Sequence, residues 1–273
     1  LFEGKKNEKF EQKITDFFSF LIDGFPFLTD YRFKITSSNT FPHSTGIASS
    51  ASSMSALGLC LVEFMHRVNG SLAGKTLFFK EASVYGGYVI WGKTPAMKGS
   101  SDNHAIPVPF EVHTAMKEMK DSILVVSSKE KTVSSRAGHS LMERHPFASA
   151  RFKSARSNVI ALSDSMVSGD LEKFINVTES EALTLHALMM SSYPSFFLFE
   201  PNTVNIVNRV RQFRKETKIP VCFTLDAGPN VHLIYPANFE SEVKEWLKSD
   251  VVRYCENGTW IDDEIGQGPE KIL

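Results

Sequence analysis

The segment Phe41-Pro-His-Ser-Thr-Gly-Ile-Ala-Ser-Ser-Ala-Ser-Ser53 is crowded with small residues. Before it, residues 31–36 alternate apolar and polar side chains, which predicts a half-buried strand. After it, apolar residues recur at helical spacing from Ala51 to Met65, which predicts a helix. Small side chains let a backbone approach a ligand closely, and the first amides of a helix point outward at the positive end of its dipole. This order of elements therefore favours the binding of a polyphosphate.

Five residues of this loop are the candidates for contact with a polyphosphate: Gly46, Ala48, Ser49, Ser50 and Ser52. Glycine can adopt turns that other residues resist, and serine hydroxyls add hydrogen-bond donors. The segment is not a Walker A loop, because no Gly-Lys-Ser/Thr closes it. On composition alone, a serine-rich helix cap without a ligand is the alternative interpretation.

The rest of the first half mixes helical and strand-like patterns. Apolar residues at helical spacing predict an amphipathic helix over Phe10–Leu21. An aromatic, glycine-containing pattern predicts a strand at Val84–Trp91. The Pro/Gly/Ser-rich stretch Thr94–Pro109 predicts an exposed loop.

The second half alternates strands with longer helices. The expected strands are residues 123–126, 221–225, 231–235 and 251–255. The expected helices are residues 141–166, a helix capped by Asp170 that runs to about Met190, a helix capped by Asn202 or Thr203, and residues 239–247. Strands interleaved with helices, with a hairpin among them, predict an α+β layer sandwich.

Composition argues against two classes of function. The 273 residues carry 30 Lys and Arg against 31 Asp and Glu, a net charge of −1, and no basic run of the kind that binds nucleic acid. No apolar run approaches the roughly 18 residues that cross a bilayer, so no membrane contact is expected. The three cysteines, Cys60, Cys222 and Cys255, have no paired spacing. Such a set favours a reducing, cytoplasmic location with the thiols as core residues.

The loop at residues 41–53 resembles the phosphate-loop motif of the GHMP small-molecule kinase superfamily, Pro-x-x-x-Gly-Leu-x-Ser-Ser-Ala. The motif stands here as Pro42, Gly46, Ile47, Ser49, Ser50 and Ala51, with isoleucine in place of leucine. Three further segments are similar to the diphosphomevalonate decarboxylase branch of that superfamily. They are Val84-Tyr-Gly-Gly-Tyr-Val-Ile-Trp91, Ser127-Ser-Lys-Glu-Lys-Thr-Val-Ser-Ser-Arg-Ala-Gly138 and Phe223-Thr-Leu-Asp-Ala-Gly-Pro-Asn230.

This resemblance runs from about the first helix almost to the C-terminus, and it implies an α+β, GHMP-kinase two-domain fold. It places a βαβ-type ATP-binding domain at residues 1–120 and a ferredoxin-like α/β sandwich at residues 121–273. Family members are commonly homodimers, so the resemblance also implies a homodimer.

The activity implied by the resemblance is that of an ATP-dependent carboxy-lyase in the mevalonate pathway of isoprenoid biosynthesis. The substrate, mevalonate 5-diphosphate, carries a tertiary alcohol beside a carboxylate, and hydroxide is a poor leaving group. Phosphorylation of that oxygen by ATP, then loss of phosphate and CO2, yields isopentenyl diphosphate and ADP. Mg²⁺ is expected to neutralise the nucleotide phosphates, and no cluster of protein ligands is expected to hold a metal.

Three residues outside the phosphate loop carry the implied chemistry. In the family, the aspartate of the Asp-Ala-Gly-Pro turn faces the reacting hydroxyl, which makes Asp226 the expected catalytic residue. The arginine of the serine-rich loop grips the substrate's diphosphate in bacterial members, which implies that role for Arg136, with Ser135 beside it. A planar guanidinium suits the task because it chelates phosphate oxygens through two donors. On composition alone, the arginine would lie in a solvated basic loop and the aspartate in an ordinary turn.

Two family segments have no counterpart in this sequence. They are a Lys-Tyr-Trp-Gly-Lys motif before the phosphate loop and a Gly-Ser-Gly-Ser-Ala-Cys-Arg stretch before the Tyr-Gly-Gly strand. Either the sequence joins parts of a longer chain, or the chain is a degenerate homologue that binds a nucleotide or metabolite without turnover. We favour the first, because Asp226 and Arg136 accompany an intact phosphate loop. The enzymatic alternatives are a mevalonate monophosphate decarboxylase and a mevalonate kinase.

Overall fold

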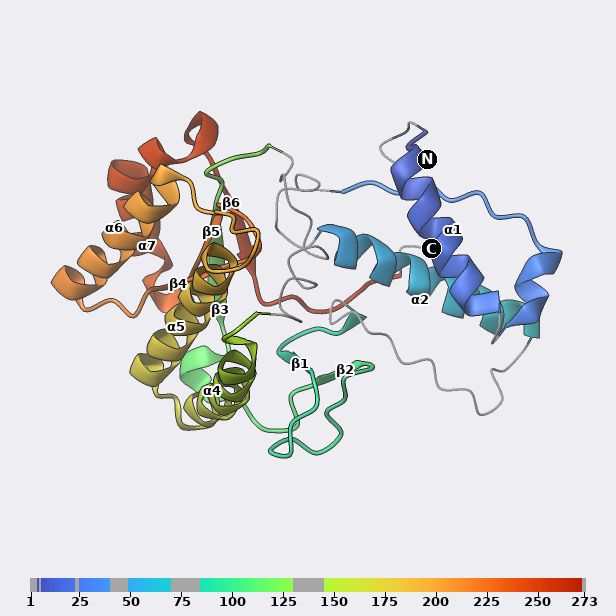
Figure 1. Cartoon of the computed structure of the whole chain (residues 1–273), viewed down its shortest axis with the longest axis horizontal. Coiled ribbons are helices and arrows are strands. Elements are labelled where there is room, and N and C mark those ends of the chain that lie inside the picture. Colours follow the sequence, from blue (N-terminus) through green and yellow to red (C-terminus); the bar gives the residue numbers. More distant parts are fainter. Residues whose placement is uncertain are drawn as a thin grey trace. The chain divides into compact units, whose positions relative to one another are not determined.

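The computed structural model describes residues 4, 6–22, 25–39, 49–69, 84–129 and 145–271 (Figure 1). The chain forms two compact units, residues 1–43 and residues 44–273. The second unit holds a two-stranded hairpin and a four-stranded sheet with helices packed on it, which confirms the expected α+β class. Among the helices that the structure describes, none has the length and apolar character of a membrane span.

The first unit is built around helix α1, Glu8–Ile22, as the sequence predicts for residues 10–21. The side-chain oxygen of Asn7 accepts a hydrogen bond from the backbone N–H of Phe10, at 3.0 Å, and so caps the helix start. A short 3-10 helix, Pro26–Asp30, follows.

The strand predicted at residues 31–36 is wrong. These residues belong to no helix and no strand in the part of the first unit that the structure describes, although Tyr31 itself has an extended backbone. Alternating side chains indicate an extended backbone, whereas a strand also needs a neighbouring strand to bond to. Here the alternation serves aromatic packing on α1, with the ring centroids of Phe18 and Phe33 4.9 Å apart.

The second unit begins with helix α2, Ser49–Asn69, which confirms the helix predicted after the small-residue loop. Strands β1, Val89–Trp91, and β2, Ala105–Pro107, then form a short antiparallel hairpin. The strand predicted over residues 84–91 is therefore confirmed only at its end, since Gly87 has a φ of +69° that interrupts extended geometry. The predicted loop over residues 94–109 contains β2, which is too short to show alternation in sequence.

The four-stranded sheet has the order β4-β5-β3-β6 with antiparallel neighbours throughout. Strand β3 is Met119–Leu124, β4 is Cys222–Leu225, β5 is Val231–Pro236 and β6 is Trp260–Glu264. The predicted hairpin of residues 221–225 and 231–235 is confirmed, with Leu225 opposite Val231.

One face of this sheet carries the larger apolar cluster. Phe223 of β4 and Leu233 of β5 lie on this face and are fully buried, because successive side chains of a strand alternate between faces. Helix α6, Pro201–Thr217, supplies Ile206 and Val210 to the cluster, and helix α7, Glu240–Trp246, supplies Val243.

The opposite face packs against a helical pair. Helices α4, Ala148–Ser168, and α5, Leu171–Met190, contact each other, and α5 contacts β4. Met166 of α4 and Ile175 of α5 pack with Cys222 in a second apolar cluster. The Asp170 carboxylate accepts a hydrogen bond from the backbone N–H of Lys173, which confirms the predicted helix cap.

The boundaries of two other helices differ from prediction. Helix α4 starts later than the predicted residue 141: residues 141–144 lie outside the described part of the chain, and residues 145–147 form a turn. Helix α6 begins after Glu200, not at Asn202 or Thr203. The Thr203 hydroxyl nevertheless serves the helix start, because it accepts a hydrogen bond from the Glu200 N–H at 3.2 Å.

The strand predicted at residues 251–255 is also wrong. The predicted helix at 239–247 is confirmed as α7, but its helical turns continue from Leu247 to Tyr254. Leu247, Val251 and Cys255 are all buried. Because they recur every fourth residue, they mark one face of a helix, not a strand. Strand β6 was not predicted either.

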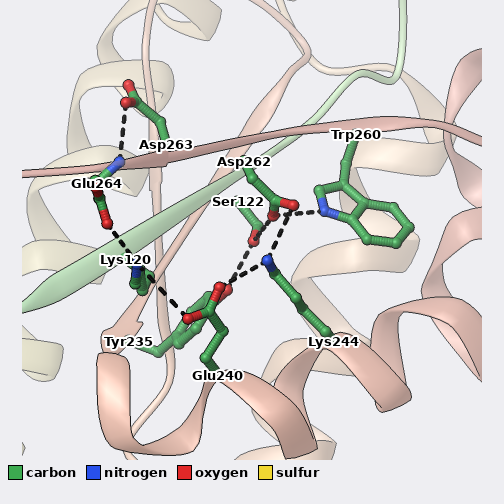
Figure 2. A network of polar contacts seen from close by, with 9 residues as sticks. All are labelled: Lys120, Ser122, Tyr235, Glu240, Lys244, Trp260, Asp262, Asp263 and Glu264. Atoms are coloured by element: carbon green, nitrogen blue, oxygen red, sulfur yellow. Dashed lines mark hydrogen bonds and ion pairs between the residues drawn. The ribbon is translucent and has the colours of Figure 1, made fainter.

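A network of polar side chains ties β6 and α7 to β3 (Figure 2). Lys120 of β3 pairs with Glu264 of β6 and, at 3.6 Å, with Glu240 of α7. Lys244 of α7 pairs with Glu240 at 2.6 Å and with Asp262 of β6 at 3.1 Å. A single exposed ion pair contributes little to the free energy of unfolding. This network, however, links three elements and so favours one register for the edge strand β6.

The backbone at Gly86 packs directly on the C-terminal segment. A Cβ atom at this position would lie 2.5 Å from the carbonyl carbon of Gln267 and 2.7 Å from the nitrogen of Gly268. The adjacent Gly87 N–H donates to the Gly266 carbonyl at 2.8 Å. This close approach of two backbones explains the glycine pair in the Tyr-Gly-Gly segment.

Replacing Gly86 with alanine should therefore lower the free energy of unfolding by about 1–3 kcal/mol, because backbone atoms block the added methyl group. The matched control is Gly266→Ala, whose Cβ would meet only the Gly268 nitrogen among the described residues, at 4.0 Å, and should change stability by less than about 0.5 kcal/mol. Urea unfolding of both variants measures the difference. Equal destabilisation would contradict this account.

Candidate functional site

The turn between β4 and β5 carries the predicted catalytic aspartate. Asp226 directly follows β4, and its side chain is exposed. The turn closes on itself, since the Gly228 N–H donates to the Asp226 carbonyl at 2.8 Å. The Asp226 carboxylate thus lies at the tip of the hairpin, on an exposed residue.

Two helices hold this turn from its main chain. The Nε2 atom of His186, on α5, lies 3.0 Å from the Asp226 carbonyl oxygen, and its ring stacks on Phe199 at 4.4 Å. Burial lowers the pKa of His186, although the carbonyl opposes that effect. The neutral ring therefore donates its Nε2–H to the carbonyl. From α6, the Thr203 hydroxyl donates to the Pro229 carbonyl at 2.6 Å.

Asn230 joins the turn to the end of β3. Its side-chain oxygen accepts hydrogen bonds from the backbone N–H groups of Val126 and Ser127, at 2.8 Å and 3.0 Å. These two amides would otherwise continue the strand, which explains why β3 ends at Leu124 and not at residue 126 as predicted. The chain beyond Ser127 leads toward the segment that contains Ser135 and Arg136.

A pocket of about 360 Å³ lies beside this strand end. Ser127 and Lys129 line it from the β3 side, and Glu200 and Asn202 line it at the start of α6. Glu256 completes the wall and accepts a hydrogen bond from the Ser128 N–H. Carboxylates and a lysine both face this pocket, so its lining does not favour an anion.

Behind the turn, a histidine and an aspartate pair on one face of the sheet. Nδ1 of His232, on β5, lies 2.7 Å from a carboxylate oxygen of Asp121, on β3. Burial lowers the pKa of His232, but the hydrogen bond to Asp121 and the charges of Asp121, Asp226 and Asp263 outweigh it, so the pKa is raised.

The structure places only part of the predicted site. Asp226 is exposed at its hairpin, and Ser52 lies half-buried in the first turn of α2. Ser49 and Ser50 belong to the helical backbone of α2. The other predicted contacts lie outside the described residues: Gly46, Ala48, Ser135 and Arg136. A shared cleft between the start of α2 and Asp226 stays a prediction.

The sequence alone does not indicate the side chains that hold the turn or lie behind it. His186 and His232 lie in no motif with ligand spacing. The one available signal was for Thr203, which reads as a helix cap, but a cap gives no hint that its hydroxyl also reaches Pro229.

Comparisons with known proteins cover most of the chain. The model of the mevalonate 5-diphosphate decarboxylase C-terminal domain matches residues 122–267. The model of the diphosphomevalonate decarboxylase-like N-terminal domain matches residues 1–105. The diphosphomevalonate decarboxylase of Saccharomyces cerevisiae is 29% identical over 232 residues, which are 80% of this chain and 56% of the yeast protein. The chain therefore spans little more than half the length of that relative.

Solved structures share the fold. The mevalonate diphosphate decarboxylase of Staphylococcus aureus has a TM-score of 0.75 at 24% identity, with 98% of this chain and 80% of that chain covered. A structure of MDDEF in complex with MVAPP, AMPPCP and magnesium has a TM-score of 0.74 at 24% identity, with the same coverage. The likeness confirms the expected GHMP-kinase fold.

Replacing Asn230 with alanine should lower the free energy of unfolding by about 1–3 kcal/mol, because two backbone N–H groups lose their acceptor. Asn230→Asp is the matched variant: its carboxylate keeps the acceptor oxygens and should retain more of the stability. Thermal unfolding compares the two. If the alanine variant is as stable as the wild type, Asn230 does not anchor the turn.

Proposed function

The chain belongs to the mevalonate 5-diphosphate decarboxylase family, and on that premise we propose that it converts mevalonate 5-diphosphate to isopentenyl diphosphate, with ATP consumed and ADP, phosphate and CO2 released. The observation that carries the proposal is the turn at Asp226, where the family's Asp-Ala-Gly-Pro-Asn motif ends a hairpin with its carboxylate exposed. The enzyme is then a carboxy-lyase of the mevalonate pathway.

Asp226 is assigned to the reacting hydroxyl. Hydrogen bonds from His186 and Thr203 hold the main chain of the turn, so the backbone that carries the carboxylate is held in place. A carboxylate within hydrogen-bond reach of a hydroxyl orients it or takes its proton. The same negative charge favours cation-like character at the carbon that loses phosphate.

The start of α2 is assigned to the nucleotide. Its first turn is rich in serine, with Ser52 half-buried, and the N–H groups of a first helical turn have no partner within the helix. This donor set fits a polyphosphate chelated to Mg²⁺, and the fold neighbour MDDEF is known with AMPPCP and magnesium. ATP supplies the phosphoryl group that makes the hydroxyl a leaving group. Gly46, Ala48, Ser49 and Ser50 complete the proposed set.

Arg136, with Ser135 beside it, is assigned to the substrate's diphosphate. Asn230 binds the backbone at Val126 and Ser127, so the chain that leads to Arg136 starts next to the turn at Asp226. We also assign residues 1–120 and 121–273 to two domains, in line with the ranges of the two family models. A cytoplasmic homodimer completes the proposal.

Incubation of the protein with ATP, Mg²⁺ and mevalonate 5-diphosphate should release ADP, phosphate and CO2 in equal amounts. Parallel reactions with mevalonate and mevalonate 5-phosphate test the neighbouring activities. Labelled CO2 and phosphate assays quantify the products. ADP formation without CO2 would indicate a kinase, and binding without turnover would indicate a nucleotide or metabolite sensor; either result contradicts the decarboxylase.

Asp226→Asn should reduce kcat by at least about 100-fold, since the amide neither takes a proton nor carries the charge. The fold should persist, because the turn is held through main-chain atoms and the side chain is exposed. Steady-state kinetics and circular dichroism test both expectations. Glu111→Gln, at an exposed surface pair with Lys117, is the control and should retain wild-type kcat. Unchanged activity of the asparagine variant would refute the assignment.

A further inference from the structure

The His232–Asp121 pair is not used by the proposed reaction, although it lies on the sheet next to the catalytic turn. Its two side chains are 13% and 28% exposed, and their polar atoms are 2.7 Å apart. The remaining polar atoms, Nε2 of His232 and Oδ1 of Asp121, are buried and have no hydrogen-bond partner among the described residues. Burying such a pair costs free energy of desolvation, so the pair is weak evidence for a purely stabilising role.

The strand register relates His232 to Asp226. His232 lies directly opposite Thr224, and Leu225 lies opposite Val231. Because side chains alternate between faces, Asp226 continues on the same face as Thr224 and His232. Diagonal neighbours on one face are about 7–8 Å apart, within reach of a charge interaction. The effect of Asp226 on the pKa of His232 agrees with this placement.

We propose that His232, held as a cation by Asp121, is a positioning residue for Asp226: its charge attracts the carboxylate and holds it in the orientation that the substrate hydroxyl requires. This role rests on the proposed function. It assigns no contact between His232 and the substrate, and it differs from a purely structural ion pair in making turnover depend on the charge of His232.

The charges that act on His232 come from β3, from β6 and from the turn after β4. Asp121 on β3, Asp263 on β6 and Asp226 after β4 each favour the cation. Tyr88 and Cys222 belong to the apolar cluster of the same face, and burial raises the pKa of both groups, that of Tyr88 to about 12, so they stay neutral. The helices α4 and α5 bring apolar residues to this cluster, Met166 and Ile175 among them.

The direction of the pH dependence follows from the raised pKa of His232. The cation is present at pH values below that pKa and is lost as the pH rises through it. The wild-type kcat should therefore fall on the alkaline side of the usual histidine pKa, about 6.5. Removal of Asp121 takes away the hydrogen bond and a charge that stabilise the cation, so the fall should move to lower pH.

Kinetic pH profiles of three proteins test this expectation. His232→Gln should reduce kcat at pH 6.5 by about tenfold, the size of one charge interaction near a protein surface, and should abolish the alkaline fall. Asp121→Asn should keep kcat at acidic pH and shift the fall toward acid. Both variants are checked by circular dichroism and thermal unfolding. Profiles parallel to that of the wild type, with only a lower melting temperature, would overturn the proposal in favour of a structural pair.

Asp263→Asn is the matched control. Asp263 lies opposite Asp121 in the β3–β6 ladder and favours the His232 cation by charge alone. Its replacement should shift the alkaline fall by less than half the shift seen with Asp121→Asn. An equal shift would overturn the specific role given to Asp121.

A second measurement does not need turnover. In protein labelled at histidine, NMR titration follows the His232 ring, whose signal is identified by its absence from His232→Gln. Coupling between two charges is reciprocal, so Asp226→Asn should lower the His232 titration midpoint by about half a pH unit. An unchanged midpoint overturns the proposal even in an active enzyme. A lowered midpoint in a protein without decarboxylase activity supports the coupling and refutes the proposed function alone.

Discussion

The two hydrogen bonds accepted by the side chain of Asn230 link the parts of the candidate site that the structure describes. They end β3 at Leu124, because the amides of Val126 and Ser127 bond to the side chain and not to a strand. The same residue closes the turn that begins at Asp226. One amide oxygen thus couples the position of the turn that carries the proposed catalytic aspartate to the point where the chain leaves for the predicted diphosphate-binding segment. Backbone amides that are withdrawn from water, even partly, need a hydrogen-bond partner, so the side chain of Asn230 is not easily replaced.

The two faces of the central sheet have different tasks. One face buries the large apolar cluster beneath α6 and α7, and its polar network ties down the edge strand β6 (Figure 2). The other face packs on α4 and α5, but near the turn it carries the charged pair of Asp121 and His232. The larger apolar cluster is therefore on one face, while the charged pair of Asp121 and His232 is on the other. The six residues of β5 contribute to both faces, because successive side chains of a strand point to opposite sides of the sheet.

Local patterns predicted elements well where a helix buries one face. The spacing of apolar residues predicts helices α1, α2, α5 and α7, and the capping residue Asp170 predicts where α5 starts. The failures have a common cause. Residues 31–36 alternate without a partner strand, and residues 251–255 look strand-like although Val251 and Cys255 lie on a continued helical turn. Pairing and burial depend on distant residues, which a local window does not contain.

The family motifs, read along the chain, established the fold class and named Asp226, because these motifs are runs of neighbouring residues whose order is visible without coordinates. The side chains around the turn were not visible in that way. His186, Thr203 and His232 are separated from Asp226 by as many as 40 residues, and each becomes relevant only when helices and strands pack. Hydrogen bonds and charge pairs of this kind require the two groups to be close in space, and only the packing of helices and strands brings them together.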